Sequence, residues 1–304
     1  MTNKRSAAPA VVLPLLLLFT AAFQQKTEGP NAISLPAGNP LIAAADTHYV
    51  RRQEGRAGAV AGPREIGLAV AGYDRAAQAP DSAEARWKLA RALYFQGAYT
   101  EQDDDSQRAI FDKARRAGDE AIHIVERRAV SRGAPPFDGR SPEEVSASVR
   151  SDIDAAPAFF WASVAWGRWA LAFGKIQAAK TGAAEKIRDY ARTVISLDPD
   201  FEEGGGYRIL GRLHNQAPWI PFLTGWVSRG QALENLRKAV AINGRNFVNR
   251  HFLAEALAEG DAADRSEAIR IEESLVADGP SPGHLVEELA IQEEARKNLA
   301  RWKK

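Results

Sequence analysis

Apolar residues recur three or four positions apart along most of the chain from Pro63 onward. Spacing of this kind marks the buried face of an amphipathic helix, and no segment shows the strict alternation of a strand. The pattern therefore predicts an all-α protein. Helices are expected to begin at Pro63, at Asp81 or Ser82 and at Ser141, and to lie near Ser106–Ala129, Pro157–Lys175, Ala183–Leu197, Gly205–Gln216, Ser228–Ile242, Val248–Glu259, Ser266–Ala277 and Leu285–Trp302.

Start signals support these assignments. Ser141-Pro142-Glu143-Glu144 reads as an N-cap, a proline in the first turn and an acidic first turn. The segment Pro157–Lys175 is apolar nearly all round, which indicates a helix buried between its neighbours. Short turns between helices of this length predict antiparallel hairpins.

The N-terminus has the pattern of an export segment. Lys4 and Arg5 precede an apolar run from Ala7 to Phe23. We expect residues 1–22 to be a signal peptide cut before Phe23, or alternatively an uncleaved membrane anchor, so the folded part would be periplasmic or membrane-anchored facing the periplasm. Residues 23–62 are rich in glycine and proline and are expected to form a linker with one weak helix at most, followed by a helical repeat domain over 63–304.

Composition narrows the chemistry. The 304 residues carry a formal net charge of +1 and no cysteine. The absence of cysteine excludes disulfides, thiolate nucleophiles, cysteine zinc sites and lipid attachment through an N-terminal cysteine. A charge near zero offers no electrostatic reason to expect a nucleic-acid partner.

A degenerate repeat organises the helical region. Small residues follow a large one in Leu89-Ala90, Trp166-Gly167, Leu210-Gly211 and Leu253-Ala254. With the alanines of the following helices and a stop at Pro80 or Pro199, these pairs resemble the tetratricopeptide repeat. The last three pairs are 44 and 43 residues apart, and HEAT or armadillo repeats of roughly 40–47 residues also fit that period. The expected fold is an α-solenoid of degenerate tetratricopeptide-like helical hairpins.

Three segments carry a more specific resemblance: Phe159-Phe160-Trp161 with Trp166-Gly167-Arg168-Trp169, then Leu197-Asp198-Pro199-Asp200-Phe201, then Tyr207 to Leu213. Together they look like the T-component family of TRAP-type transporter systems. The resemblance implies an exported helical repeat protein that associates with a periplasmic solute-binding protein, sometimes as a ring with an apolar pore. This sequence lacks the lipoprotein cysteine common in that family, and Trp219 to Trp226 stands where a glycine pair is usual.

Catalytic, metal and cofactor signatures were sought without success. No two of the five histidines are three or four positions apart, so no helical metal site is predicted. The acidic run Glu101–Asp105 lacks the glycine and distant glutamate of a calcium loop. Glu202 to Gly206 lacks the strand and the lysine of a phosphate loop, and is better explained as a helix junction. The sequence predicts no enzyme activity, no metal and no cofactor.

Alignment of the first helices on their large–small pairs predicts a binding groove. Solenoids of this type expose a concave face lined by the first helix of each hairpin. A basic, aromatic-edged lining would suit a carboxylate or an acidic peptide, whereas the alternative is that the arginines are solvated or paired with acids such as Glu202 and Glu255. The residues expected to face inward and bind are Trp87, Arg91, Tyr94, Arg168, Arg208, Arg212, Asn215 and His251.

The tryptophans divide into two groups. Trp161, Trp166 and Trp169 are expected in the core, because bulky aromatics on an all-apolar helix are normally buried. The apolar loop carrying Trp219, Phe222 and Trp226 could instead cover the core or form a contact surface.

These observations predict a non-catalytic binding or scaffold protein of a TRAP-type uptake system. Its partner would be a solute-binding receptor or another envelope protein, with a small hydrophobic or carboxylate ligand as a further option and self-association left open. The membrane would be reached only through an uncleaved N-terminal segment. The alternatives are a general envelope scaffold that binds no small molecule, and an enzyme with an unrecognised site.

Overall fold

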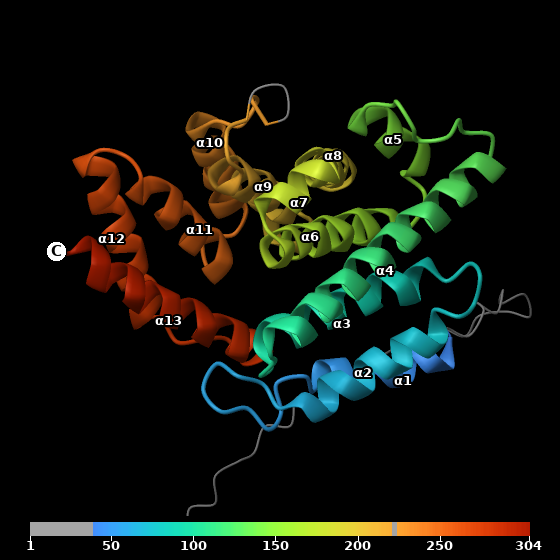
Figure 1. The fold of residues 1–304 in the computed structure, drawn as a ribbon, viewed down its shortest axis with the longest axis horizontal. Helices are drawn as coiled ribbons and strands as arrows, with labels where there is room; N and C mark the ends of the chain where they lie inside the picture. Colours follow the sequence, from blue (N-terminus) through green and yellow to red (C-terminus); the bar gives the residue numbers. More distant parts are fainter. Residues whose placement is uncertain (1–38, 221–223) are drawn as a thin grey trace, which may run out of the picture. The chain divides into compact units, whose positions relative to one another are not determined.

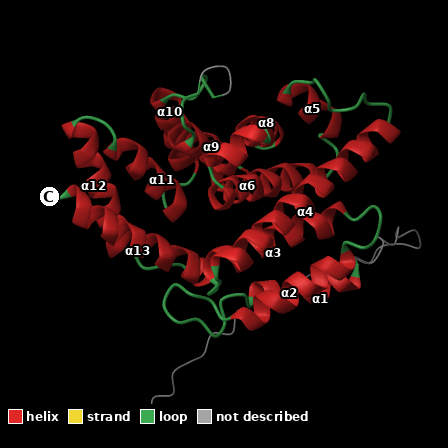
Figure 2. Cartoon of the chain, in the orientation of Figure 1, coloured by secondary structure: helices red, strands yellow, loops and turns green. Residues whose placement is uncertain are grey.

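The described part of the chain is all-helical. A computed structural model describes residues 39–220 and 224–304, and within those ranges it contains helices and loops but no strand (Figure 2). The α-helices are α1 Pro40–Val50, α2 Pro63–Ala76, α3 Ala83–Tyr99, α4 Asp104–Ser131, α5 Pro142–Val149, α6 Ala155–Phe173, α7 Lys175–Lys180, α8 Ala183–Leu197, α9 Phe201–Gln216, α10 Arg229–Ile242, α11 Phe247–Ala258, α12 Ala262–Ala277 and α13 Leu285–Trp302, with a single 3-10 turn at Pro282–His284.

Most helix boundaries agree with the sequence prediction. The helices at Ala183–Leu197 and Leu285–Trp302 are confirmed to the residue, and the others end within a few positions of the expected places. The capping box at Ser141 is also confirmed, because its hydroxyl accepts from the amide of Glu144 and the Glu144 carboxylate accepts from the amide of Ser141.

The start of the helical unit differs from the expectation. Residues Gly38–Lys304 form one compact unit, whereas the expected boundary was Pro63. Helix α1 lies inside the segment expected to be a linker: the Asn39 side chain caps it, Pro40 opens it, and Ile42 and Ala45 are buried. Its apolar residues follow no clear helical stripe, so the sequence pattern did not reveal it. The expected signal peptide or anchor, residues 1–22, lies outside the described residues.

Successive helices pack against one another in pairs. Extensive contacts join α1 to α2, α3 to α4, α6 to α8, α9 to α10 and α11 to α12. Each pair also contacts the next, most extensively where α4 packs on α6 (Figure 1). The additional short helices α5 and α7 pack mainly on α8 and α6. In this arrangement α3, α6, α9 and α11 are the first helices of successive pairs.

Helix α6 lies at the centre of the largest core cluster. It contacts α3, α4, α8 and α9, which explains why its sequence is apolar on nearly every side. Trp161, Trp166 and Trp169 are buried, so their predicted core role is confirmed. The indole N–H of Trp166 donates to Asp119 at 2.7 Å, and that of Trp169 donates to Asp112 at 3.1 Å. These bonds satisfy the polar edge of each ring inside the core.

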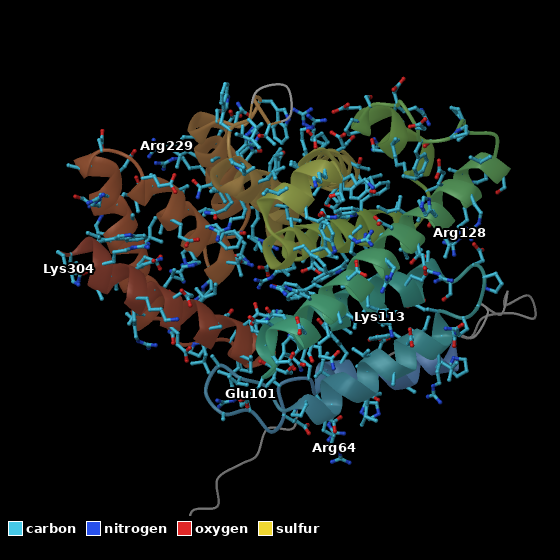
Figure 3. All side chains as sticks on the ribbon, viewed as in Figure 1. Arg64, Glu101, Lys113, Arg128, Arg229 and Lys304 are labelled. Atoms are coloured by element: carbon cyan, nitrogen blue, oxygen red, sulfur yellow. The ribbon has the colours of Figure 1, made fainter. Side chains whose placement is uncertain are left out.

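A cluster of ion pairs fixes the C-terminal end of α4, where Arg128 is labelled in Figure 3. The Nη1 of Arg128 lies 2.9 Å from Oδ2 of Asp154 and 3.4 Å from Oδ1 of Asp152. Its Nε lies 3.3 Å from Oδ1 of Asp81. Arg128 therefore joins the turn before α3 to the turn before α6.

The large–small pairs do not all have the same packing role. A Cβ added to Gly211 would lie 2.6 Å from Cγ of Leu236, so only glycine allows α9 and α10 to approach this closely. Gly167 has no such neighbour within 4 Å. The close approach of α6 to α4 is instead made by Gly118 against Ala162. The sequence alignment gave Gly167 and Gly211 the same place in their large–small pairs. In the structure only Gly211 is needed for close packing of two helices.

The last helix returns to the first loop. Arg52, which is only 7% exposed, pairs with Glu287 of α13 at 2.7 Å and donates to the carbonyl of Gly283 at 2.8 Å. The Gln53 side chain accepts from the amide of Val286 at 2.8 Å. Figure 1 shows the start of α13 beside the loop that connects α1 to α2. These contacts, which we call the closing contact, join residues more than 200 positions apart.

Candidate functional site

The helices enclose a cavity of about 1310 Å³, which we call the central cavity. It is lined by α3, α6, α9, α11 and the start of α13, together with Tyr49 and Arg52. Figure 3 shows side chains projecting into the space among these helices. The first helices of successive pairs thus supply much of the lining, as the sequence alignment predicted.

Most of the residues expected to face inward do so. Arg91, Tyr94, Arg168, Arg208, Arg212 and His251 all line the central cavity. Trp87 and Asn215 do not. The indole N–H of Trp87 donates to Asp154 at 3.0 Å, which holds that ring against the start of α6. Two buried atoms of Asn215 have no hydrogen-bond partner among the described residues, and this residue is not part of the cavity lining.

Three of these arginines form the centre of the candidate site. Arg91, Arg168 and Arg208, which we call the arginine cluster, have no carboxylate oxygen within 4.0 Å in the ranges that the structure describes. The Nε of Arg91 is buried without a hydrogen-bond partner in the same ranges. A partly buried guanidinium without a counter-ion is unfavourable, so this arrangement favours an anion from outside the chain.

An aromatic ring lies beside each guanidinium of the arginine cluster, although acidic residues such as Glu202 and Glu287 also line the cavity. The Arg91 guanidinium lies 3.9 Å from the ring centre of Tyr49, Arg168 lies 5.2 Å from that of Tyr94, and Arg208 lies 6.0 Å from that of Phe160. Cation–π contacts stabilise a guanidinium modestly without neutralising its charge.

Trp161 connects the rings beside Arg168 and Arg208, and Arg91 lines the same cavity. Tyr94 and Trp161 have ring centres 6.0 Å apart, and Trp161 and Phe160 have ring centres 5.0 Å apart. Tyr99 meets Tyr94 edge to face, and the two hydroxyls are 3.3 Å apart. The arginine cluster is therefore one site rather than three separate surface charges.

Electrostatics differ within the cluster. Burial opposes the charge of Arg168, but the neighbouring hydroxyls of Tyr94 and Tyr99 outweigh it and raise the pKa of Arg168. Burial lowers the pKa of Arg208, and the nearby charges of Glu202 and Glu203 offset this only in part. Burial also raises the pKa of Tyr99 well above its usual value, so this hydroxyl remains a neutral donor. Two tyrosine hydroxyls beside a guanidinium can donate to a bound anion.

Arg208 is positioned by a strained turn. Its Nη1 donates to Oδ1 of Asn249 at 2.8 Å and to the carbonyl of Glu202 at 3.2 Å. Glu202 and Glu203 have left-handed backbone angles, with φ of 49° and 59°, and Gly204 follows at 80°. Such angles cost about 1–3 kcal/mol at each non-glycine residue and persist only where the surroundings impose them.

Asn249 is the residue that imposes this geometry. It is fully buried, and its Nδ2 donates to the carbonyls of Glu203 at 3.0 Å and Ala239 at 2.9 Å. The junction predicted at Glu202 to Gly206 is present, since the strained turn opens α9. The sequence analysis did not identify Asn249, because its partners come from α9 and α10.

The remaining arginines of the cavity are paired within the chain. Arg212 forms an ion pair with Glu255 and lies 4.3 Å from the ring centre of Phe252. Arg52 pairs with Glu287 in the closing contact. The expectation that Glu255 could neutralise a groove arginine therefore holds for Arg212, whereas Glu202 forms no ion pair with Arg208 in the described residues.

His251 belongs to a polar network beneath the cavity surface. Its Nδ1 lies 3.0 Å from Oε1 of Glu272, which is fully buried and also accepts from Asn298 at 3.0 Å. This network links α11, α12 and α13. His251 is only 4% exposed, so its side chain is held mainly for structure.

The two tryptophans described in the loop after α9 have different surroundings. Trp226 packs back on the protein, with its ring centre 5.3 Å from that of His214 and the Arg188 guanidinium 4.9 Å away. Trp219 is 64% exposed, although its indole N–H donates to the carbonyl of Gly225 at 3.1 Å. Phe222 lies outside the described residues. One tryptophan thus covers the core and the other faces solvent.

The described residues hold no group of three or more histidine, cysteine, aspartate or glutamate side chains placed to bind a metal ion. Among the same residues, no helix has both the length and the apolar character that a bilayer span requires.

The comparisons with known proteins add no relative. No protein-family model matches the chain and no curated protein matches it, so its function has to be inferred from the geometry of the central cavity.

Proposed function

We propose that this protein is a non-catalytic binding protein whose central cavity holds an anionic organic ligand. The observation that carries the proposal is the arginine cluster: three guanidinium groups from α3, α6 and α9 share one cavity and have no carboxylate partner in the described chain. Arginine binds carboxylate and phosphate groups in bidentate fashion, and the adjoining tyrosine hydroxyls add donors.

The proposed architecture is a degenerate tetratricopeptide-type solenoid. Two features support it: the pairwise packing of consecutive helices, and the position of α3, α6, α9 and α11 along the central cavity. The closing contact joins the last helix to the loop after α1 at one side of the cavity.

The proposed setting is a TRAP-type uptake system in the periplasm, with a solute-binding protein as partner. The resemblance of Phe159 to Trp169 and of Tyr207 to Leu213 to the T-component family supports this setting. In the structure these two segments lie on α6 and α9, and they contribute Arg168 and Arg208 to the central cavity.

Titration calorimetry tests the ligand proposal directly. The probes are succinate, benzoate and decanoate, each compared with its uncharged amide. We expect at least one carboxylate to bind at a single site, its amide to bind at least tenfold more weakly, and Arg208→Gln to lose the difference. Equal binding of acid and amide, or no binding of any probe, would overturn the proposal.

A second function is favoured by a separate observation. Leu171, Ile176 and Trp219 are 68%, 76% and 64% exposed, and large exposed apolar side chains often mark protein contacts. The alternative is therefore a general envelope scaffold that binds proteins and no small molecule. Affinity capture from an envelope extract with mass spectrometry separates the two: recovery of a solute-binding receptor supports the uptake role, and recovery of unrelated envelope proteins alone supports the scaffold.

A further inference from the structure

One side of the central cavity carries no charge. Six of its lining residues also belong to a packed apolar cluster beneath Trp166 and Trp169. We call them the aliphatic wall, and they are Ala170, Ala178, Ala183, Ile187, Ile209 and Leu213. They come from α6, α7, α8 and α9, so the wall is continuous across neighbouring helices.

The aliphatic wall begins where the arginine cluster ends. Ile209 directly follows Arg208 on α9, and Ala170 lies two positions after Arg168 on α6. From there the wall continues toward the C-terminal ends of α6 and α9, where Leu171 and Ile220 also line the cavity. The cavity therefore has a region of arginine and tyrosine beside a region of alkyl side chains, and the start of α13 adds acidic residues elsewhere in the lining.

This segregation restricts the ligand. A compact dianion such as succinate would use the arginines but would leave the alkyl surface in contact with water. An uncharged lipid would cover the wall but leave the arginine cluster without a counter-ion. A ligand with one anionic group and an aliphatic body satisfies both ends, because it buries apolar surface while neutralising buried charge.

We propose that the ligand is an anionic amphiphile, with its carboxylate at Arg168 and Arg208 and its alkyl chain along the aliphatic wall. This inference rests on the proposed function and narrows it to one chemical class. The hydroxyls of Tyr94 and Tyr99 lie beside Arg168 and are hydrogen-bonded to each other, so the one that accepts keeps its proton to donate to the same carboxylate.

A chain-length series tests the inference. The probes are butyrate, hexanoate, octanoate and decanoate at monomeric concentrations, measured by titration calorimetry. Burial of each added CH₂ group is expected to tighten binding roughly fourfold until the wall is covered. Decanol, without the charge, and decyltrimethylammonium, with the opposite charge, are expected to bind at least tenfold more weakly than decanoate.

A matched pair of variants tests the position of the chain. Ala184 lines the cavity in the first turn of α8, where the helix dipole tolerates an acid, so Ala184→Asp should fold. It is expected to weaken decanoate at least tenfold and to leave butyrate within about twofold, because the alkyl chain of decanoate alone would strip water from the new carboxylate. Ala184→Leu should keep the chain-length dependence.

The outcomes separate this inference from the proposed function. Affinity that does not change with chain length, or succinate binding more tightly than decanoate, would overturn the amphiphile while leaving an anion-binding cavity. If no anion binds at all, both fall. Arg270→Gln, at an exposed arginine on α12 outside the cavity, should behave as the wild type in every titration.

Discussion

Arg168 and Arg212 occupy matching places in two consecutive hairpins, yet their surroundings differ. Each follows a glycine in a first helix, and each lines the central cavity. Arg212 meets Glu255 from the next first helix, whereas Arg168 meets Tyr94 and Tyr99 from the preceding one. The same residue is thus part of an internal ion pair in one hairpin and a candidate ligand anchor in the other. What a repeat position does depends on the helix that it faces.

The largest expected difference is in ligand binding. Arg168→Gln should weaken decanoate by about thirtyfold or more, since removing one partner of a buried charge pair costs about 2 kcal/mol or more. Arg212→Gln should change it less than threefold, because Glu255 already neutralises that guanidinium. Titration calorimetry measures both, and circular dichroism with thermal unfolding confirms that each variant is folded.

Removing the carboxylate of Glu255 tests whether its ion pair causes the difference between Arg212 and Arg168. Glu255→Gln would leave Arg212 without its carboxylate partner and make its surroundings resemble those of Arg168. The affinity for decanoate is then expected to rise about threefold, which is within the range of a partly exposed charge. Equal losses in Arg168→Gln and Arg212→Gln would contradict the assignment of Arg168 as the anchor.

Alanine substitutions at the glycines before these two arginines should change the free energy of unfolding in opposite directions. Gly211→Ala is expected to lower the free energy of unfolding by about 1–3 kcal/mol, because the new Cβ would lie 2.6 Å from Leu236. Gly167→Ala should raise it by about 0.5–1 kcal/mol, because no neighbour lies within 4 Å and alanine favours the helix. Urea unfolding of the two variants measures both changes. If both raise the free energy of unfolding, α9 and α10 are not packed as closely as described.

The smallest expected effect is a change of stability with pH at the closing contact of Arg52. Its partner Glu287 lies 3.8 Å from Nδ1 of His284, and this carboxylate raises the pKa of His284 above its usual value of 6.5. Stabilisation from a raised pKa is fully present below the unfolded value and is lost as the pH rises through the folded value. The free energy of unfolding should therefore decrease slightly just above pH 6.5.

The side chain of His284 is 66% exposed, so solvent screening keeps this effect small. Burial opposes the charge of Glu287, but hydrogen bonds from His284 and Arg52 outweigh it and lower the pKa of Glu287. The stabilisation that ionised Glu287 contributes is lost instead as the pH falls through its lowered pKa. The His284→Gln variant should lose the decrease in the free energy of unfolding above pH 6.5 and should keep the decrease at low pH. An unchanged profile in that variant would show that His284 does not contribute to the closing contact.

Sequence reasoning was most successful where a local signal was strong. Helix bounds followed from apolar spacing and from start and stop residues, as for α5 with its capping box at Ser141. It allowed one weak helix before Pro63 but did not locate α1, whose apolar residues follow no stripe although Asn39 and Pro40 mark its start. The inward column that contains Arg208 and His251 also contains Trp87, which is directed toward Asp154 instead.

The sequence by itself determined the all-helical class, the extent of most helices and the position of arginines on the first helices α3, α6 and α9. Those features depend on neighbours within a few turns of the same helix. Only the tertiary structure decided which arginines keep a free charge, because Glu255 and Glu287 reach Arg212 and Arg52 from other helices. The same holds for the aliphatic wall and the closing contact, since side chains from separate helices create both surfaces only after the helices have packed.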